Sequence, residues 1–180
     1  MDPARPFKTL PFINAKAGFE VDGNDYNDRD ALEKNGSAVT VIDITRTVRV
    51  YDFVTTYTEN AQGAADDAYR WTVTMTNIQA KMYSVNTVFL SAPYDRAIVI
   101  DDDSVTAKPY AVRPKTVRAS LRSLIDDLWM VQAWSKNRED IVNSIDAEID
   151  AGNGGRINAQ INDSIALGGR IFAISYNFIV

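Results

Sequence analysis

The last eleven residues of the chain, 170–180, carry an alternating apolar pattern that constrains the fold more than any other segment. Side chains alternate across a strand, so one face would carry Phe172, Ile174, Tyr176, Phe178 and Val180. Such a face must be covered, because an open apolar edge recruits other chains. Two interpretations follow. The segment is either the final core strand of its own domain or a strand exchanged between subunits.

Composition limits the functions open to this chain. Its 180 residues can form one core, and we expect an extended leader over 1–27 and a single domain over 28–180. The net charge of −5 argues against nucleic acid as the main partner. No apolar run approaches the roughly 18 residues of a membrane span, and the N-terminus does not resemble a signal peptide. We therefore expect no membrane partner.

The chain has no His and no Cys. Their absence removes the usual general base, the Ser-His and Cys-His nucleophilic pairs, and thiol and structural zinc chemistry. An enzyme here would have to work with carboxylates, Lys, Arg or Tyr. We expect neither catalysis nor a cofactor.

The N-terminal half predicts one helix, two strands and a loop. Asn27 or Asp28 can cap a helix that runs to about Lys34 and stops at Asn35-Gly36. Alternating segments over 37–44 and 47–55 predict a strand pair, and residues 60–68 a loop.

A helical stripe begins at Trp71, with apolar residues at alternating steps of four and three. Its members are Trp71, Met75, Ile78, Met82, Val85 and Phe89, and Pro93 ends the helix. A short strand over 97–100 and an acidic turn over 101–104 follow. A second helix, over about Lys115–Trp134, opens at Pro114. Its predicted buried stripe is Val117, Leu121, Leu124, Ile125, Leu128 and Val131.

Residues 138–150 fit both a helix and a strand. We favour a short helix to about Asn143 and then a strand, because Ala151–Gly155 is a turn and 156–161 alternates beyond it. With the terminal strand, this predicts a three-stranded C-terminal meander. The expected class is α+β, with helices packed on a mixed sheet.

No group of residues makes a credible active site. Asp101-Asp102-Asp103 could attract Mg²⁺ or Ca²⁺, but adjacent carboxylates usually decorate a solvated turn. Residues 22–33 resemble a calcium loop but have Asn27 where its sharp turn needs Gly. The glycines of 152–155 and 168–169 fit turns rather than phosphate loops. Trp129 and Trp134 could form a ligand platform, but core or interface positions explain them better.

Four ordered blocks resemble the C-terminal part of the Mu-like contractile tail sheath proteins of bacteriophages. They are Asp2–Pro6 with Thr9-Leu10; Thr55-Thr56-Tyr57 with Asn60, Gly63, Asp66 and Tyr69; Val112 with Pro114-Lys115-Thr116 and Arg118-Ala119; and Gly155–Asn158 with Arg170–Ala173. The resemblance covers nearly the whole chain. Family members are longer and have outer domains before this point. The region 95–106 departs from the family pattern.

The resemblance implies a sheath subunit that assembles with other copies into helically stacked hexameric rings around a tail tube. It further implies terminal arms that add strands to neighbouring copies, and as other partners the tail tube protein, the baseplate and the tail terminator. The expected location is the phage virion, after assembly in the host cytoplasm. The alternative function is a small carboxylate-dependent, virion-associated hydrolase, which would lose activity in Asp102→Asn.

A contact with a sliding tube should be polar and reversible. The charged residues that flank the last helix and the next strand are therefore the candidate tube-facing residues. They are Arg138, Glu139, Asp140, Asp146 and Glu148.

Overall fold

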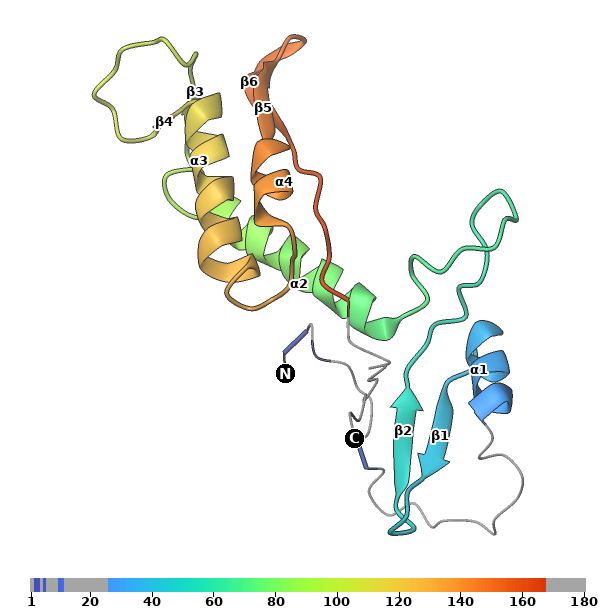
Figure 1. Cartoon of the computed structure of the whole chain (residues 1–180). Coiled ribbons are helices and arrows are strands. Elements are labelled where there is room, and N and C mark those ends of the chain that lie inside the picture. Colours follow the sequence, from blue (N-terminus) through green and yellow to red (C-terminus); the bar gives the residue numbers. More distant parts are fainter. Residues whose placement is uncertain (1, 4, 6–9, 12–25, 168–180) are drawn as a thin grey trace, which may run out of the picture. The chain divides into compact units, whose positions relative to one another are not determined.

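The computed structural model describes residues 2, 3, 5, 10, 11 and 26–167. The chain divides into two compact units, residues 1–75 with 167–180 and residues 76–166 (Figure 1). The boundary falls inside one helix. The predicted division into a leader and a single core domain stays a prediction.

Unit 1 contains helix α1 (Tyr26–Lys34) and an antiparallel hairpin of β1 (Val39–Ile42) and β2 (Val48–Asp52). The predicted helix stop is confirmed. Ser37 N–H donates to Leu32 O at 2.9 Å and Gly36 N–H to Glu33 O at 3.0 Å, which together form a Schellman motif. Gly36 has a φ of +77°, a conformation that costs glycine little.

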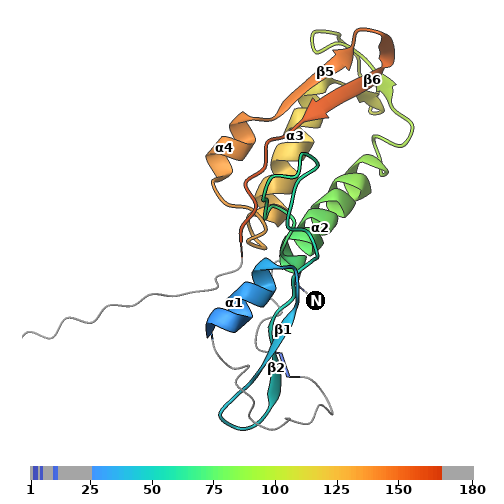
Figure 2. The ribbon, with the colours of Figure 1, turned by 90° about the vertical axis from the view of Figure 1, so that its right-hand side faces the viewer.

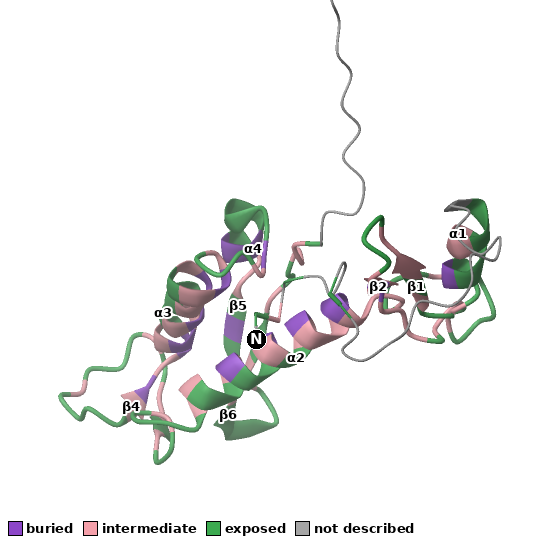
Figure 3. Cartoon of the chain, turned by 90° about the horizontal axis from the view of Figure 1, so that it is seen from below, coloured by how far each residue is buried: buried purple, intermediate pink, exposed green. Residues whose placement is uncertain are grey.

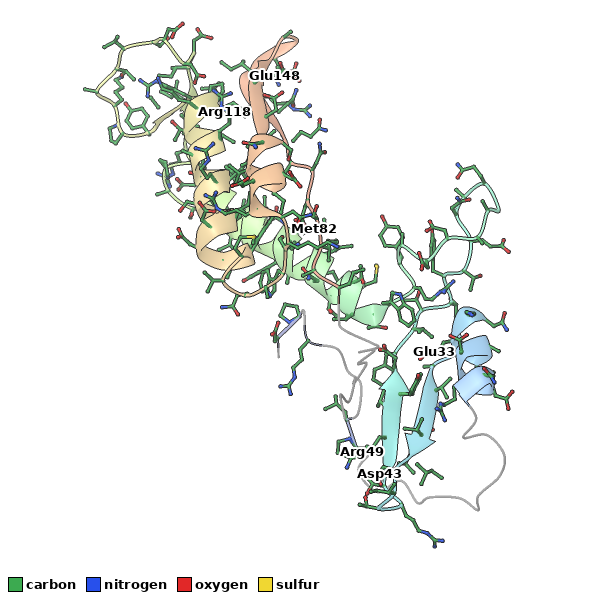
Figure 4. The ribbon with its side chains drawn as sticks, in the orientation of Figure 1. Glu33, Asp43, Arg49, Met82, Arg118 and Glu148 are labelled. Atoms are coloured by element: carbon green, nitrogen blue, oxygen red, sulfur yellow. The ribbon has the colours of Figure 1, made fainter. Side chains whose placement is uncertain are left out.

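The hairpin turn between β1 and β2 is organised by Asp43. Its Oδ1 accepts backbone N–H groups from Thr45 at 2.8 Å and Thr47 at 2.9 Å, and its Oδ2 pairs with Arg49 (Figure 4). These bonds hold the pKa of Asp43 well below its usual range, with the Thr45 hydroxyl as the largest cause. The Asp43 carboxylate thus stabilises the turn that connects the two strands at residues 45 and 46.

Helix α2 (Thr72–Phe89) enters unit 2. The other elements of unit 2 are β3 (Ile98–Val99), β4 (Ala111–Val112), α3 (Pro114–Leu124), the π-helical turn η1 (Ile125–Trp129), α4 (Arg138–Asn143), β5 (Asp146–Asp150) and β6 (Asn153–Gln160). Figure 2 shows α2 and α4 on opposite sides of α3. The helix-then-strand interpretation of 138–150 and the turn into β6 are confirmed.

The core of unit 2 consists of two apolar clusters on the α3–η1 segment (Figure 3). The first joins Val112, Val117 and Leu121 to Ala147 of β5, and the second joins Ile125 and Trp129 to Ile141 and Val142 of α4. Within the described residues, no helix is long and apolar enough to cross a membrane.

The α+β class is confirmed, and among the described residues no single sheet is itself mixed. Over the described residues the strands form separate two-stranded sheets: β1–β2 and β5–β6 are antiparallel, and β3–β4 is parallel. The pairing of β3 with β4 was not predicted, because a two-residue strand carries no periodicity. The third strand of the predicted meander lies outside the described residues.

The second predicted helix does not continue to Trp134. After Leu124 it widens into η1, in which Met130 N–H donates to Ile125 O at 2.9 Å, and turns follow. A π turn inserts one residue into the helical repeat and so rotates the residues beyond it. Trp129 consequently enters the core, and Val131, which we expected to be buried, is 68% exposed.

Candidate interaction surfaces

The candidate tube-facing residues of α4 lie at its N-terminus, where Glu139 and Asp140 are exposed. Arg138 makes a bidentate ion pair with Asp126 of η1, Nε to Oδ1 at 2.6 Å and Nη2 to Oδ2 at 2.7 Å. Hydrogen bonds from Arg138 lower the pKa of Asp126, and Asp126 in turn raises the pKa of Arg138. Arg138 therefore orients α4 on η1. Because the charge of Arg138 is paired with Asp126, the exposed carboxylates of Glu139 and Asp140 make this end of α4 acidic.

The other two candidates lie on the outer face of the β5–β6 hairpin. Asp146 and Glu148 are exposed and stand opposite Gln160 and Asn158. The intervening Ala147 is buried against α3, and its carbonyl accepts a hydrogen bond from Arg118 Nη1 at 2.7 Å (Figure 4). The alternation of β5 thus turns its carboxylates outward. The exposed carboxylates of α4 and β5, Glu139, Asp140, Asp146 and Glu148, are here together called the acidic surface of unit 2.

An apolar groove of about 520 Å³ lies on the inner side of β6. Alternate residues of that strand, Gly155, Ile157 and Ala159, form one wall, while Phe89 of α2 and Leu121 of α3 contribute to the others. Among the described residues, β6 has a strand partner only on its β5 side. In the described part of the chain, the other edge of β6 thus carries no paired strand, and one face of β6 lines the apolar groove.

The predicted inter-subunit strand residues, Phe172, Ile174, Tyr176, Phe178 and Val180, lie outside the described residues. Residues 22–25 of the weak calcium-loop match also lie outside the described residues, whereas its residues 26–33 belong to α1, where Glu33 is buried.

In the acidic turn at 101–104, the carboxylate of Asp102 has a structural role. Asp102 Oδ1 accepts the backbone N–H of Lys115 at 2.8 Å, and its Oδ2 pairs with Arg118 at 2.7 Å. The first of these bonds is the largest cause of the lowered pKa of Asp102. Asp102 therefore ties the turn to the start of α3. In the described parts of the chain, no group of three or more carboxylates is placed to hold a metal ion.

Packing explains Trp129 and a turn explains the glycines of 152–155, whereas Gly168 and Gly169 lie outside the described residues. Trp129 is buried, and its Nε1 donates to Ser84 Oγ at 3.0 Å. The Gly152–Gly155 segment lies at the β5–β6 turn, where Asp150 Oδ1 accepts the N–H of Gly152 at 2.8 Å.

The block Thr55–Tyr69 that carried part of the family resemblance folds as one loop of unit 1. Tyr57 Oη donates to Asp66 Oδ2 at 2.6 Å, which raises the pKa of Tyr57 to about 12, and its ring packs edge-on against Tyr69. Asn60 Oδ1 accepts the N–H groups of Gln62 and Ala64, each at 3.0 Å. The spacing of the residues in this block thus reflects the hydrogen bonds and ring contact that stabilise the loop.

Sequence analysis missed a buried polar cluster in unit 2. Lys81 Nζ of α2 donates to Ser135 Oγ at 2.8 Å and pairs with Asp163 Oδ2 at 2.5 Å, and Ser135 Oγ donates to Asp163 Oδ1 at 2.8 Å. The Lys81 side chain is only 6% exposed. One feature of the sequence could have indicated this cluster: Lys81 is the single charged residue of the predicted helix that begins at Trp71.

The sequence comparison relates the chain to a tail sheath protein, as the four sequence blocks predicted. Over all 180 residues the chain is 23% identical to the Mu-like prophage FluMu tail sheath protein of Haemophilus influenzae, of which it spans 37%. No family model matches.

A solved structure supports the fold. The chain aligns over 99% of its length, with a TM-score of 0.59 and 13% identity, to a chain in the cryo-EM structure of the anti-feeding prophage baseplate, 6-fold symmetrised. It covers 46% of that chain. The protein thus spans less than half of the length of the relatives it matches.

Proposed function

We propose that this chain acts as a non-catalytic subunit of a contractile phage tail sheath. Copies polymerise as helically stacked hexameric rings around the tail tube and contract to drive the tube through the host envelope. The sequence match to a tail sheath protein over the whole chain carries this proposal. Its partners are the tube, the baseplate and the tail terminator. It resides in the virion after assembly in the host bacterial cytoplasm.

Strand exchange would link the copies. Among the described residues, one edge of β6 has no paired strand and can accept a further one, and the groove along one face of β6 offers apolar surface for alternate side chains. The terminal segment has the matching pattern in Phe172, Ile174 and Tyr176. We therefore propose that the terminal strand of one copy pairs with β6 of a neighbour and remains attached while copies slide during contraction.

The acidic surface formed by Glu139, Asp140, Asp146 and Glu148 would face the tube. Polar contacts can break and re-form as the sheath moves, whereas a large apolar contact would resist sliding.

Deletion of Asn177–Val180 tests the exchanged strand. We expect a folded monomer with the circular dichroism spectrum of the parent chain and no polymer in sedimentation or negative-stain microscopy. Phe178→Leu keeps the alternation and should still polymerise, so it serves as the control. Loss of the fold would assign the strand to its own domain, and undiminished polymers would show that the strand is not the link.

A further inference from the structure

Helix α2 has its charge on the inside and a neutral surface on the outside. Its only charged residue is Lys81, which is buried. The exposed positions of its C-terminal half are Gln79, Met82, Tyr83, Asn86 and Thr87, and Leu90 follows the helix directly. These residues share one side of the helical repeat and are here called the α2 stripe. Met82 is 62% exposed, Tyr83 74% and Leu90 78%.

The Lys81 cluster holds this orientation of the helix. Lys81 Nζ contacts Ser135 and Asp163 and lies 5.2 Å from the centre of the Trp129 ring. A rotation of α2 that buried Met82 and Tyr83 would break these contacts and leave the carboxylate without its ammonium partner. Met82, next to Lys81 in sequence, therefore stays exposed. Met82 is thus exposed although it belongs to the apolar stripe that predicted the helix.

The α2 stripe differs from the exposed faces of the other described helices. Those faces carry charges, such as Lys34 on α1, Arg122 on α3 and Glu139 on α4. Protein interfaces are enriched in Tyr and Met and depleted of Lys, Glu and Asp. The α2 stripe thus has the composition of a contact surface.

We propose that the α2 stripe contacts a second copy of this chain. Every copy is acidic, with a net charge of −5, so a contact through the surface of Glu139, Asp140, Asp146 and Glu148 would be repulsive. The uncharged stripe lets two copies approach without that cost. It also lies on α2, on the opposite side of α3 from α4, so it leaves the acidic surface open (Figure 2).

This inference rests on the proposed function, because a sheath needs lasting contacts between copies as well as a sliding contact with the tube. A charge-free surface that exposes Met82, Tyr83 and Leu90 suits the lasting contact. The acidic surface suits the sliding one.

Photo-crosslinking identifies what covers the stripe. Benzoylphenylalanine would replace Tyr83 in the full chain, mixed equally with ¹⁵N-labelled chain, and illuminated with and without tail tubes. We expect peptides that join labelled and unlabelled copies. A cross-link confined to one copy's own terminal segments, a cross-link to the tube, or no cross-link would each overturn the inference.

Charged substitutions test its energetic role. Met82→Glu with Tyr83→Glu should raise the apparent Kd of self-association by tenfold or more, on the order of a hot-spot loss, with an unchanged melting temperature. The control, Ala119→Glu with Ser123→Glu, adds the same charge at exposed positions of α3 and should associate as the parent does. Equal association of both variants would overturn the inference.

The two proposals can fail separately. If polymers form but Tyr83 cross-links elsewhere, the sheath role stands and the α2 stripe is not its contact. If no variant or parent chain assembles at any concentration, both proposals fail.

Discussion

At the scale of single residues, Lys81 shows how a buried charge is accommodated in this fold. Burial lowers the pKa of Lys81, and the hydrogen bond to Asp163 opposes that shift. Ser135 accepts from the ammonium and donates to the carboxylate, so both ions keep a hydrogen-bond partner inside unit 2. Breaking a buried ion pair costs more than the pair contributes, because the remaining charge stays desolvated.

Lys81→Met should therefore lower the free energy of unfolding by about 3 kcal/mol, since Asp163 would lose its partner. Urea unfolding measures this loss. The double variant Lys81→Met with Asp163→Asn should recover part of the lost unfolding free energy. As the control, Lys136→Met replaces an exposed lysine and should stay within about 0.5 kcal/mol of the parent. A loss in the double variant equal to the sum of the two single losses would show that the pair is not coupled.

At the scale of elements, the join of α3 to η1 decides which side chains form the core. The regular helical repeat predicts Leu124 and Leu128 among the buried residues, but both are only partly buried. Ile125, which that repeat also predicts as buried, is fully buried in the second cluster, and the π turn that begins there brings Trp129 into the same cluster. The insertion of one residue thus selects Trp129, whose Nε1 reaches Ser84 of α2.

Ile125→Ala should destabilise the chain by about 2–5 kcal/mol, because it leaves a cavity that the surrounding side chains fill only in part. Leu124→Ala, one position away, should cost less than half as much, since water already reaches part of that side chain. Chemical unfolding of the two variants under identical conditions makes the comparison. Equal losses would mean that Leu124 is as deeply buried as Ile125.

At the scale of the whole molecule, the acidic character of the chain separates two kinds of contact. Its sequence pI is about 4.7, so copies repel one another at neutral pH. Added salt screens that repulsion and would favour contacts between copies through the neutral α2 stripe. The same screening would weaken a contact between the acidic surface and a complementary tube.

Glu139→Lys with Asp140→Lys should accordingly weaken assembly on tail tubes while the isolated chain stays folded. Co-sedimentation with tubes at low and moderate salt measures the effect, which should shrink as salt rises. Asp101→Lys with Asp103→Lys makes the same change of net charge at two other exposed carboxylates and should leave tube assembly intact. Normal tube assembly by the α4 variant would remove these residues from the tube contact.

The sequence by itself determined the elements whose signals are local. These elements depend on interactions between neighbouring residues. They are the Gly36 stop of α1, the β1–β2 pair, the extent of α2, the Pro114 start of α3 and the change from α4 to β5. Four ordered blocks were also enough to identify the tail sheath relationship.

Tertiary structure decided which side of each helix is buried and which strands pair. A stripe such as Trp71 to Phe89 marks a helix, but α2 is apolar on more than one side, so its periodicity could not place Met82. The ion pair of Lys81 with Asp163, distant in sequence, fixed that choice. The π turn and the parallel β3–β4 pair likewise depend on contacts between segments far apart along the chain, which no local pattern encodes.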